Sequence, residues 1–256
     1  MRLLELFSGT GSVGRAFRAR GWEVVSLDSD PKASPTICAD ILAWQPEGSF
    51  DMVWASPVCA EYSRALTRRP RDLEAGDRLV RRTLEIIAQL QPRWWAIENP
   101  QTGLLKTRPF MQHLPFCDVC YCTYGFRYRK ATRIWTNLPW QPRPMCRKGS
   151  RCEAFADGRH PELAQRGSSG GRSSATHTQR QLYSMPPALC QELALVASAF
   201  SFSRAPPPSL QKLDGAPQHA RQPRVVQAEE LGAVLGVDAA RQGLPDDAQR
   251  PDLLRH

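Results

Sequence analysis

Two side chains that can take part in covalent and proton-transfer chemistry follow two apolar runs of the chain. Cys59 comes four residues after a run that ends at Ala55, and Glu98 comes directly after a run that ends at Ile97. A thiolate is a nucleophile, and a carboxyl group that is partly removed from water can hold a proton near neutral pH. The pair therefore suits a reaction in which a thiolate attacks while an acid supplies a proton.

The residues around Cys59 and Glu98 favour these roles. Arg64, Arg68 and Arg69 follow Cys59, and their positive charge would favour the thiolate. Two tryptophans and a proline flank Glu98 and would desolvate it. A lone cysteine is more often an inert apolar side chain, so the hypothesis depends on the two groups lying close together.

A glycine-rich turn follows the first apolar run, at 7–12 (Phe-Ser-Gly-Thr-Gly-Ser). Glycines let a backbone approach a ligand closely, and the helix that follows offers free N–H groups. Asp28 could bind ribose hydroxyls and Asp40 an adenine amino group, although either could instead be a turn former. Nicotinamide and flavin enzymes share such a turn, so alone it indicates a nucleotide-like cofactor without identifying it.

Alternating apolar runs and helical patterns must position these residues. We expect strands at 2–7, 22–27, 36–39, 50–55 and 94–97 and helices at 12–20 and 73–90. This alternation predicts an α/β fold with a doubly wound parallel sheet, whose ligands bind at the carboxyl ends of the strands. Because Phe7, Asp28, Asp40, Pro57 and Glu98 all fall at such ends, we expect them to surround one cleft.

The pattern changes in the second half of the chain. We expect short strands at 119–124 and 132–136, an irregular stretch at 139–174 and a helix at 186–200. A Pro/Arg-rich tail follows, which we expect to be largely disordered apart from a helix near 228–235. The domains are then a catalytic domain at 1–138 and 179–203, a small basic target-recognition insert at 139–178, and the tail at 204–256.

The positive charge is concentrated in one segment. Residues 123–182 hold twelve Lys/Arg and three acidic residues, an excess equal to the +9 of the whole chain. A polyanionic partner is the natural interpretation, and a solvated basic surface is the alternative. The chain has no apolar run long enough for a membrane span, no signal-like N-terminus and scattered cysteines. We expect a monomer that is cytoplasmic or nuclear, not secreted and not at a membrane.

Five motifs resemble, in order, those of the DNA (cytosine-5)-methyltransferase family. They are Leu-Phe-Ser-Gly-Thr-Gly-Ser at 6–12, the two aspartates Asp28 and Asp40, Ser-Pro-Val-Cys at 56–59, Glu-Asn-Pro at 98–100 and Arg-Lys-Ala-Thr-Arg at 129–133. The resemblance covers 2–138 and resumes at 180–193. It implies a Rossmann-like fold that uses S-adenosyl-L-methionine to methylate cytosine C5 in DNA.

The resemblance also implies a role for each matching residue. Cys59 would attack cytosine C6, Glu98 would hydrogen-bond to N3 and the exocyclic amine, and Arg133 would steady the base and the nucleophile loop. The base must be flipped out of a duplex. The methyl donor would contact Phe7, Ser8, Gly9, Thr10, Gly11, Ser12, Asp28, Asp40, Ile41 and Pro57. The nucleic acid would contact Arg64, Arg68, Arg129, Lys130, Arg143, Arg147, Lys148 and Arg151.

Four positions depart from the family pattern. Val58 stands where the family has proline and Tyr183 where it has asparagine. Arg129 and Ala131 take the places of the glutamine and the first arginine of a Gln-x-Arg-x-Arg motif. Two alternatives therefore stay open: an RNA cytosine-5 methyltransferase, and a catalytically silent nucleic-acid-binding protein on the same fold. A nicotinamide-dependent oxidoreductase would explain neither the thiol and carboxyl pair nor the basic segment.

Zinc would explain how so short and polar an insert holds a shape. The insert contains Cys146, Cys152 and His160, with Cys120 and Cys122 upstream. The spacing Cys-x5-Cys-x7-His is not a standard one, and a flexible Arg-rich loop is the alternative. The sequence alone therefore assigns no metal ligand.

Overall fold

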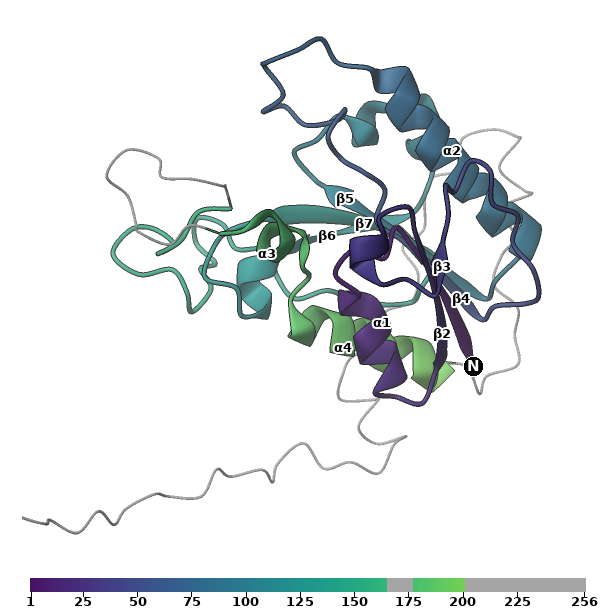
Figure 1. Ribbon diagram of the computed structural model, residues 1–256. Coiled ribbons are helices and arrows are strands. Elements are labelled where there is room, and N and C mark those ends of the chain that lie inside the picture. Colours follow the sequence, from purple (N-terminus) through teal and green to yellow (C-terminus); the bar gives the residue numbers. More distant parts are fainter. Residues whose placement is uncertain (165–176, 201–256) are drawn as a thin grey trace, which may run out of the picture.

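The computed structural model describes residues 1–164 and 177–200 (Figure 1). The expected tail at 204–256, with its helix near 228–235, lies outside these residues. The strands are β1 (Arg2–Leu6), β2 (Glu23–Asp28), β3 (Ile37–Cys38), β4 (Met52–Ala55), β5 (Trp94–Pro100), β6 (Phe116–Cys120) and β7 (Ala131–Thr136). The α-helices are α1 (Ser12–Arg18), α2 (Leu73–Leu90), α3 (Gln179–Tyr183) and α4 (Pro187–Ala199), and the 3-10 turns are η1 (Pro31–Ala33), η2 (Leu105–Thr107), η3 (Pro109–Met111) and η4 (Tyr121–Tyr124).

The seven strands form one sheet in the order β3-β2-β1-β4-β5-β7-β6. The first five are parallel, and β7 runs antiparallel to both of its neighbours. The predicted α/β class is confirmed, and the five strands expected at 2–97 are parallel, whereas the later strands β6 and β7 add an antiparallel edge. Strands β2 and β3 are added on one side of β1, and β4 and β5 on the other side. The strand order therefore reverses between β1 and β4, and open α/β sheets bind their ligands in the crevice at this point.

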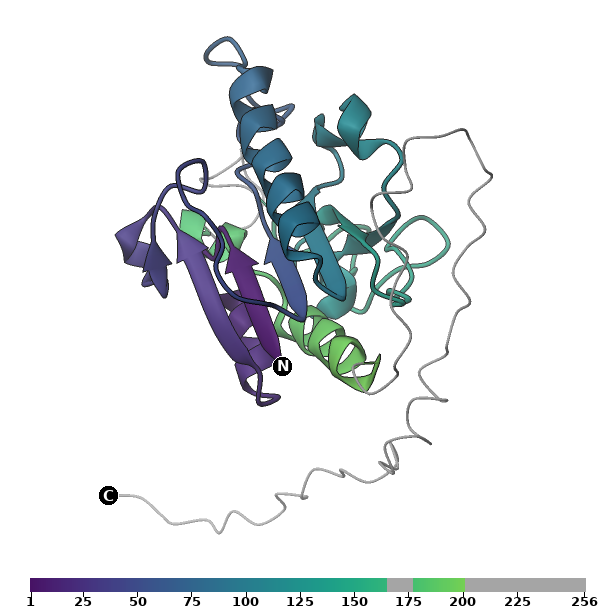
Figure 2. The ribbon, with the colours of Figure 1, turned by 90° about the vertical axis from the view of Figure 1, so that its right-hand side faces the viewer.

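The sheet has an apolar core on each face. Leu3 and Ala96 pack with α1 and α4, whereas Leu4 and Ile97 pack with α2. Figure 2 shows α2 on one side of the sheet and α4 on the other. Because successive residues of a strand point to opposite faces, Glu98 continues the row that faces α1 and α4.

Two predicted strands differ from the structure. The strand predicted at 94–97 continues to Pro100, because Glu98 and Asn99 pair with Ile134 and Arg133 of β7. The strand predicted at 119–124 is wrong: β6 ends at Cys120, where its pairing with β7 ends, and η4 follows. Glu98 and Asn99 are therefore held within the sheet rather than on a loop.

Helix α2 begins and ends where the sequence pattern predicts. Asp72 caps it by accepting a hydrogen bond from the backbone N–H of Ala75 at 2.8 Å. Its buried side includes Val80, Ile86 and Ile87. No helix of the described residues is long and apolar enough to cross a membrane.

The chain after the insert returns to the sheet beside α1. Helix α4 confirms the helix predicted at 186–200, and its Ser198 accepts a hydrogen bond from the Trp22 indole at 2.9 Å. Just before α4, the Met185 N–H donates to Ser12 Oγ at 3.3 Å. Segments more than 160 residues apart in the chain therefore belong to one folded domain.

Candidate active site

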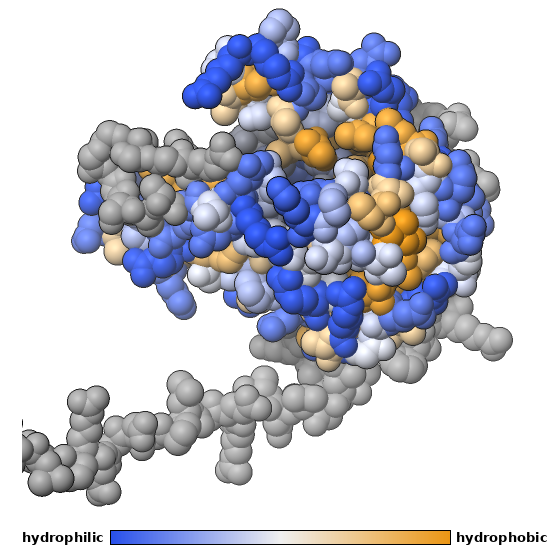
Figure 3. Space-filling model, viewed as in Figure 1, coloured by the Kyte–Doolittle hydropathy of each residue, from blue (hydrophilic) through white to orange (hydrophobic). Residues whose placement is uncertain are grey.

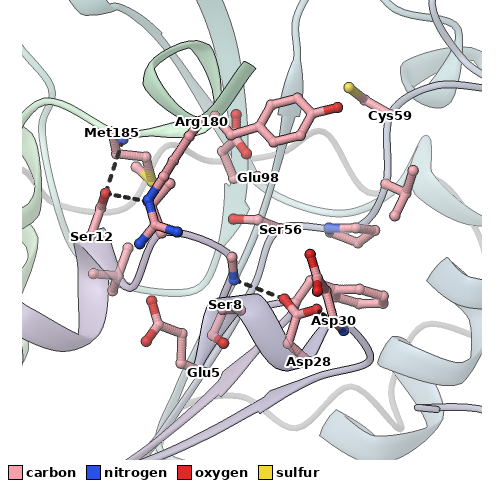
Figure 4. Close-up of a pocket in the computed structure, with 18 of the residues that line it drawn as sticks. Glu5, Ser8, Ser12, Asp28, Asp30, Ser56, Cys59, Glu98, Arg180 and Met185 are labelled. Atoms are coloured by element: carbon pink, nitrogen blue, oxygen red, sulfur yellow. Dashed lines mark hydrogen bonds between the residues drawn. The ribbon is translucent and has the colours of Figure 1, made fainter. Parts of the chain in front are cut away.

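A cavity of about 630 Å³ opens at the carboxyl ends of the central strands (Figure 4). The turn after β1, the end of β2, the segment after β4, the end of β5 and the segment around α3 all line it. Of the residues that the sequence singled out, the cavity is lined by Phe7, Ser8, Gly9, Thr10, Ser12, Asp28, Pro57, Cys59, Glu98 and Lys130. The structure therefore brings most of the expected cofactor and catalytic residues to one place.

The turn after β1 is held in a shape that few side chains tolerate. Phe7, Gly9 and Gly11 have φ angles of 55°, 47° and 65°, in the left-handed region. A bulky residue such as Phe7 in this region is a local strain that often marks a functional site. The Gly9 N–H donates to Asp28 Oδ2 at 2.8 Å, so the turn is tied to the end of β2. Asp28 stays at the cavity wall, where its remaining lone pairs can accept from hydroxyl groups.

Glu5 is a cavity residue that the sequence analysis missed. It lies in the middle of β1 and is almost fully buried. The Gly14 N–H donates to its Oε1 at 3.1 Å, and its Oε2 has no hydrogen-bond partner among the described residues. A Cβ at Gly14 would collide with that Oε2, so glycine is needed there. Burial raises the pKa of Glu5 to about 7.

Glu98 is buried and lines the cavity together with Cys59, and both side chains are labelled in Figure 4. The Tyr121 hydroxyl donates to its Oε1 at 3.3 Å. Burial raises the pKa of Glu98, and the opposing influences of Lys130, Tyr121 and Ser56 are smaller. A carboxyl group in this setting can keep its proton and donate it to a ligand.

The expectation that neighbouring arginines favour the Cys59 thiolate is wrong. Burial, followed by the charge of Glu98, raises the pKa of the Cys59 thiol, and only Lys130 among the side chains counteracts this. Arg64 and Arg68 are exposed. Arg69 forms an ion pair with Glu61. Closeness in sequence did not bring these guanidinium groups to the sulfur.

Lys130 provides the positive charge near the Cys59 thiol that was expected from the arginines. Its ammonium group donates to the Leu182 carbonyl at 3.0 Å and lies 4.7 Å from the centre of the Tyr121 ring. It lines the cavity and acts electrostatically on both Glu98 and Cys59. The sequence suggested only a contact to nucleic acid for this residue.

Arg133 does not line the cavity. Its guanidinium binds Asp118 with two hydrogen bonds of 2.7 and 2.9 Å, and it lies 3.5 Å from the centre of the Phe116 ring. Asn99, which pairs with Arg133 in the sheet, instead reaches the segment that carries the thiol. Its side-chain amide donates to the Pro57 carbonyl at 2.9 Å. Asn99 thus holds the Cys59 segment, a role that the sequence gave to Arg133.

Three further expected cofactor residues lie outside the cavity lining. Asp40 accepts a hydrogen bond from the Leu42 N–H at 2.9 Å and acts as the turn former that the sequence left open. Ile41 is buried in the core beside α2. Gly11 precedes α1, and its neighbours Thr10 and Ser12 reach the cavity instead.

The segment around α3 closes one side of the cavity, and its helix was not predicted. Helix α3 begins with a capping box between Thr178 and Gln181. Arg180 and Tyr183 line the cavity, and Tyr183 accepts a hydrogen bond from Gln179 at 2.6 Å. The Thr-x-x-Gln signature in the sequence could have revealed this helix. Tyr183, where the family has asparagine, is therefore part of the site.

Most of the expected nucleic-acid contacts are exposed. These residues are Arg64, Arg68, Arg129, Arg143, Arg147, Lys148 and Arg151. In Figure 3 hydrophilic residues gather on the two protrusions at the upper and left margins, which in Figure 1 are the loop before α2 and the insert. Arg143 also pairs with Glu192 of α4 at 3.3 Å.

The sheet order, the strained turn after β1 and the cavity at the strand ends define a Rossmann-like methyltransferase fold. No family model matches the chain. The chain is 36% identical over 216 residues, which are 75% of this chain and 98% of the relative, to a Frog virus 3 (isolate Goorha) protein named "Probable DNA (cytosine-5)-methyltransferase". At that identity and coverage, the chain belongs to the DNA (cytosine-5)-methyltransferase family.

Two solved structures share parts of the fold. Entamoeba histolytica methyltransferase EhMeth has a TM-score of 0.39 and 14% identity, covering 52% of each chain. A mutant of Spodoptera frugiperda DNMT2 has a TM-score of 0.36 and 15% identity, covering 68% of this chain and 56% of its own. These matches span just over half of each solved chain, and their TM-scores are too low to support an argument about function.

Proposed function

We propose that this protein transfers a methyl group from S-adenosyl-L-methionine to C5 of a cytosine in DNA, with Cys59 as nucleophile and Glu98 as acid. One observation carries the proposal: Cys59 and Glu98 line the same cavity as the strained turn after β1. The relative named for this activity supports the choice of cytosine in DNA.

The residues present fit a donor of this kind. Glu5 Oε2 and Ser8 Oγ are buried, lack hydrogen-bond partners among the described residues, and belong to residues that line the cavity. Unsatisfied buried polar atoms are costly, and a polar ligand would relieve them. Asp28 would accept hydrogen bonds from ribose hydroxyls. When bound, S-adenosyl-L-methionine supplies an electrophilic methyl group.

The chemistry requires a nucleophile because cytosine C5 is unreactive by itself. The Cys59 thiol would lose its proton to solvent and its sulfur would form a bond to C6, while Glu98 donates its proton to N3 and neutralises the developing charge. C5 would then take the methyl group, with S-adenosyl-L-homocysteine as the leaving group. Loss of the C5 proton to solvent, cleavage of the S–C6 bond and return of the N3 proton to Glu98 would release 5-methylcytosine and restore the Cys59 thiolate. Lys130 stabilises the thiolate, since it counteracts the rise in the thiol pKa.

The DNA must reach this cavity with its base flipped out of the duplex. The exposed basic residues of the insert and of the loop before α2 would bind phosphates and position the duplex. Such contacts make affinity fall as salt rises. The RNA alternative uses the same cavity and differs only in the polymer that is bound.

A mechanism-based trap tests the proposal. DNA that carries 5-fluorocytosine, together with the methyl donor, should leave a covalent adduct on Cys59, because fluorine cannot leave as the C5 proton does. Cys59→Ser should abolish the adduct and keep donor binding, whereas Cys38→Ser, a change at an exposed thiol on β3, should form the adduct normally.

Transfer of tritiated methyl groups to DNA and to RNA separates the two substrates, and bisulfite sequencing of the treated DNA identifies the modified cytosine. Label in RNA alone would contradict the choice of polymer. Binding of both polymers with label in neither would contradict an enzymatic function.

A further inference from the structure

A second cluster of chemically active side chains lies outside the cavity. Cys122, Cys146, Cys152 and His160 bring three sulfur atoms and one imidazole nitrogen within 4.8 Å of one another. Cys122 and Cys146 are buried, and Cys152 and His160 are half-buried. A residue of η4 and three residues of the insert, which begin 24 positions later in the chain, thus converge on one point, which neither the fold class nor the proposed methyl transfer requires.

The distances within the cluster are those of a tetrahedral metal site. The Nε2 atom of His160 lies 3.6 Å from the Cys146 sulfur and 3.4 Å from the Cys152 sulfur. Zinc bonds sulfur at about 2.3 Å and imidazole nitrogen at about 2.0 Å, so a regular tetrahedron separates the two kinds of ligand atom by about 3.5 Å. We propose that these four residues bind one structural zinc ion.

The ligand set selects zinc over other common metals. Three thiolates and one imidazole suit zinc, whereas magnesium and calcium require oxygen ligands. Four protein ligands fill the tetrahedron and leave no open position, which is typical of a structural site rather than a catalytic one.

Two tight turns explain the unusual spacing of the ligands. Cys146 directly precedes a turn in which Arg147 pairs with Ser150, and His160 directly follows a turn in which Ala156 pairs with Arg159. Gly149 and Gly158 in these turns have φ angles of 86° and 76°, which glycine adopts without strain. One compact turn therefore fills the gap between Cys146 and Cys152, and another fills the gap between Cys152 and His160. The unusual Cys-x5-Cys-x7-His spacing is what these two turns require.

Apart from its contacts with the catalytic domain, the described part of the insert has one small apolar cluster to hold it together. The apolar cluster in this region consists of Cys120, Cys122 and Cys146, with Met145 and Cys152 packed against it. So small a cluster buries too little surface to order a segment of this length, and a metal commonly replaces a core in such cases. Zinc therefore explains the order of this part of the chain better than a flexible Arg-rich loop does.

The proposed zinc ion would also position charge next to the catalytic domain. Arg129, just before β7, donates to the Cys146 carbonyl at 3.3 Å. The ring of Phe155 contacts the His160 ring with centres 5.3 Å apart, and Arg151 lies 4.0 Å from the centre of the Phe155 ring. Loss of the metal should therefore disrupt the contacts of Arg129, Arg151 and Phe155 with the cluster.

Metal analysis of the full chain tests the site without any activity measurement. Protein purified under reducing conditions should contain one zinc ion per chain by inductively coupled plasma mass spectrometry. Cys152→Ser and His160→Asn should reduce the zinc content at least several-fold. His160→Cys, which keeps a zinc ligand at that position, should retain the metal and shows that substitution there does not itself prevent folding. Cys117→Ser, a half-buried thiol of β6 outside the cluster, is the matched control and should also retain it.

Cobalt(II) replacing zinc should show the intense visible absorption of a tetrahedral thiolate site, and this spectrum should be lost in Cys152→Ser. Wild-type protein that takes up no zinc under reducing conditions would overturn the proposal, as would full zinc content in both Cys152→Ser and His160→Asn. The Cys120 sulfur lies 3.2 Å from that of Cys122. Loss of zinc in Cys120→Ser but not in Cys122→Ser would overturn the assignment of Cys122.

Discussion

Glu5 gives the most quantitative test of the structure, because its carboxyl group is buried under the cavity and its pKa is far from the usual value. The ordinary pKa of 4.5 rises to about 7 in the folded protein, chiefly through burial. Replacing Glu5 with glutamine removes the ionisation and keeps a side chain of nearly the same shape, with an oxygen to accept from the Gly14 N–H.

The sign and size of the effect follow from linkage. Below pH 4.5 the carboxyl group is protonated in both the folded and the unfolded chain and costs nothing. As pH rises towards 7, the unfolded chain releases the proton while the folded chain retains it, so the wild-type protein loses stability. The difference between 4.5 and about 7 corresponds to a loss of about 3 kcal/mol above pH 7.

The assay compares urea unfolding of wild-type protein and Glu5→Gln at pH 5 and pH 8. The free energy of unfolding of Glu5→Gln relative to wild type should increase by about 2 to 3 kcal/mol between the two pH values. Glu85→Gln, which removes an exposed carboxylate on α2, is the control, and its difference from wild type should stay constant. An equal difference at both pH values for Glu5→Gln would refute the argument that Glu5 is buried and uncharged at low pH.

Two further predictions concern the segment that carries the thiol. Tyr62→Phe removes a buried hydroxyl that donates to Asp77 at 2.9 Å, and urea unfolding should show a loss of about 1 to 3 kcal/mol; an unchanged midpoint would contradict it. Lys130→Met should raise the thiol pKa of Cys59 further and slow its alkylation by iodoacetamide at fixed pH. At a pH where the Glu98 carboxyl group is ionised, Glu98→Gln should accelerate that alkylation, since the Glu98 charge raises the same pKa, and equal rates in all three proteins there would refute both statements.

The arrangement of strands and the convergence of Phe7, Asp28, Cys59 and Glu98 could be predicted from the sequence. Apolar runs of strand length that end in polar or glycine residues fix both the strands and the edge at which their carboxyl ends meet. The argument needed only the order of residues along the chain, because neighbouring parallel strands place their ends together.

Side-chain direction and burial could not be predicted in the same way. Arg133 and Lys130 are three residues apart, yet one binds Asp118 away from the cavity and the other faces Glu98 and Cys59. Glu5 lies within an apolar run, and only the close approach of α1 shows that its carboxyl group is enclosed. Both outcomes depend on partners that come from elsewhere in the chain.

The convergence of sulfur and imidazole ligands was hidden for a related reason. Cys122 belongs to η4, which follows β6, whereas Cys146, Cys152 and His160 come from the insert. Common zinc motifs place ligands in pairs on one turn. Here a complete turn separates Cys146 from Cys152 and another separates Cys152 from His160, and Cys122 joins them only in three dimensions.

The two ends of the insert are fastened to the catalytic domain independently of what lies between them. At its start, Trp140 and Arg143 both donate to Glu192 of α4, at 2.8 and 3.3 Å. Past its far end, the Leu182 carbonyl accepts from Lys130 at 3.0 Å. Such anchoring allows the segment to act as an exchangeable cassette: its length and composition can diverge while Cys59, Glu98 and Lys130 keep their places in the cavity.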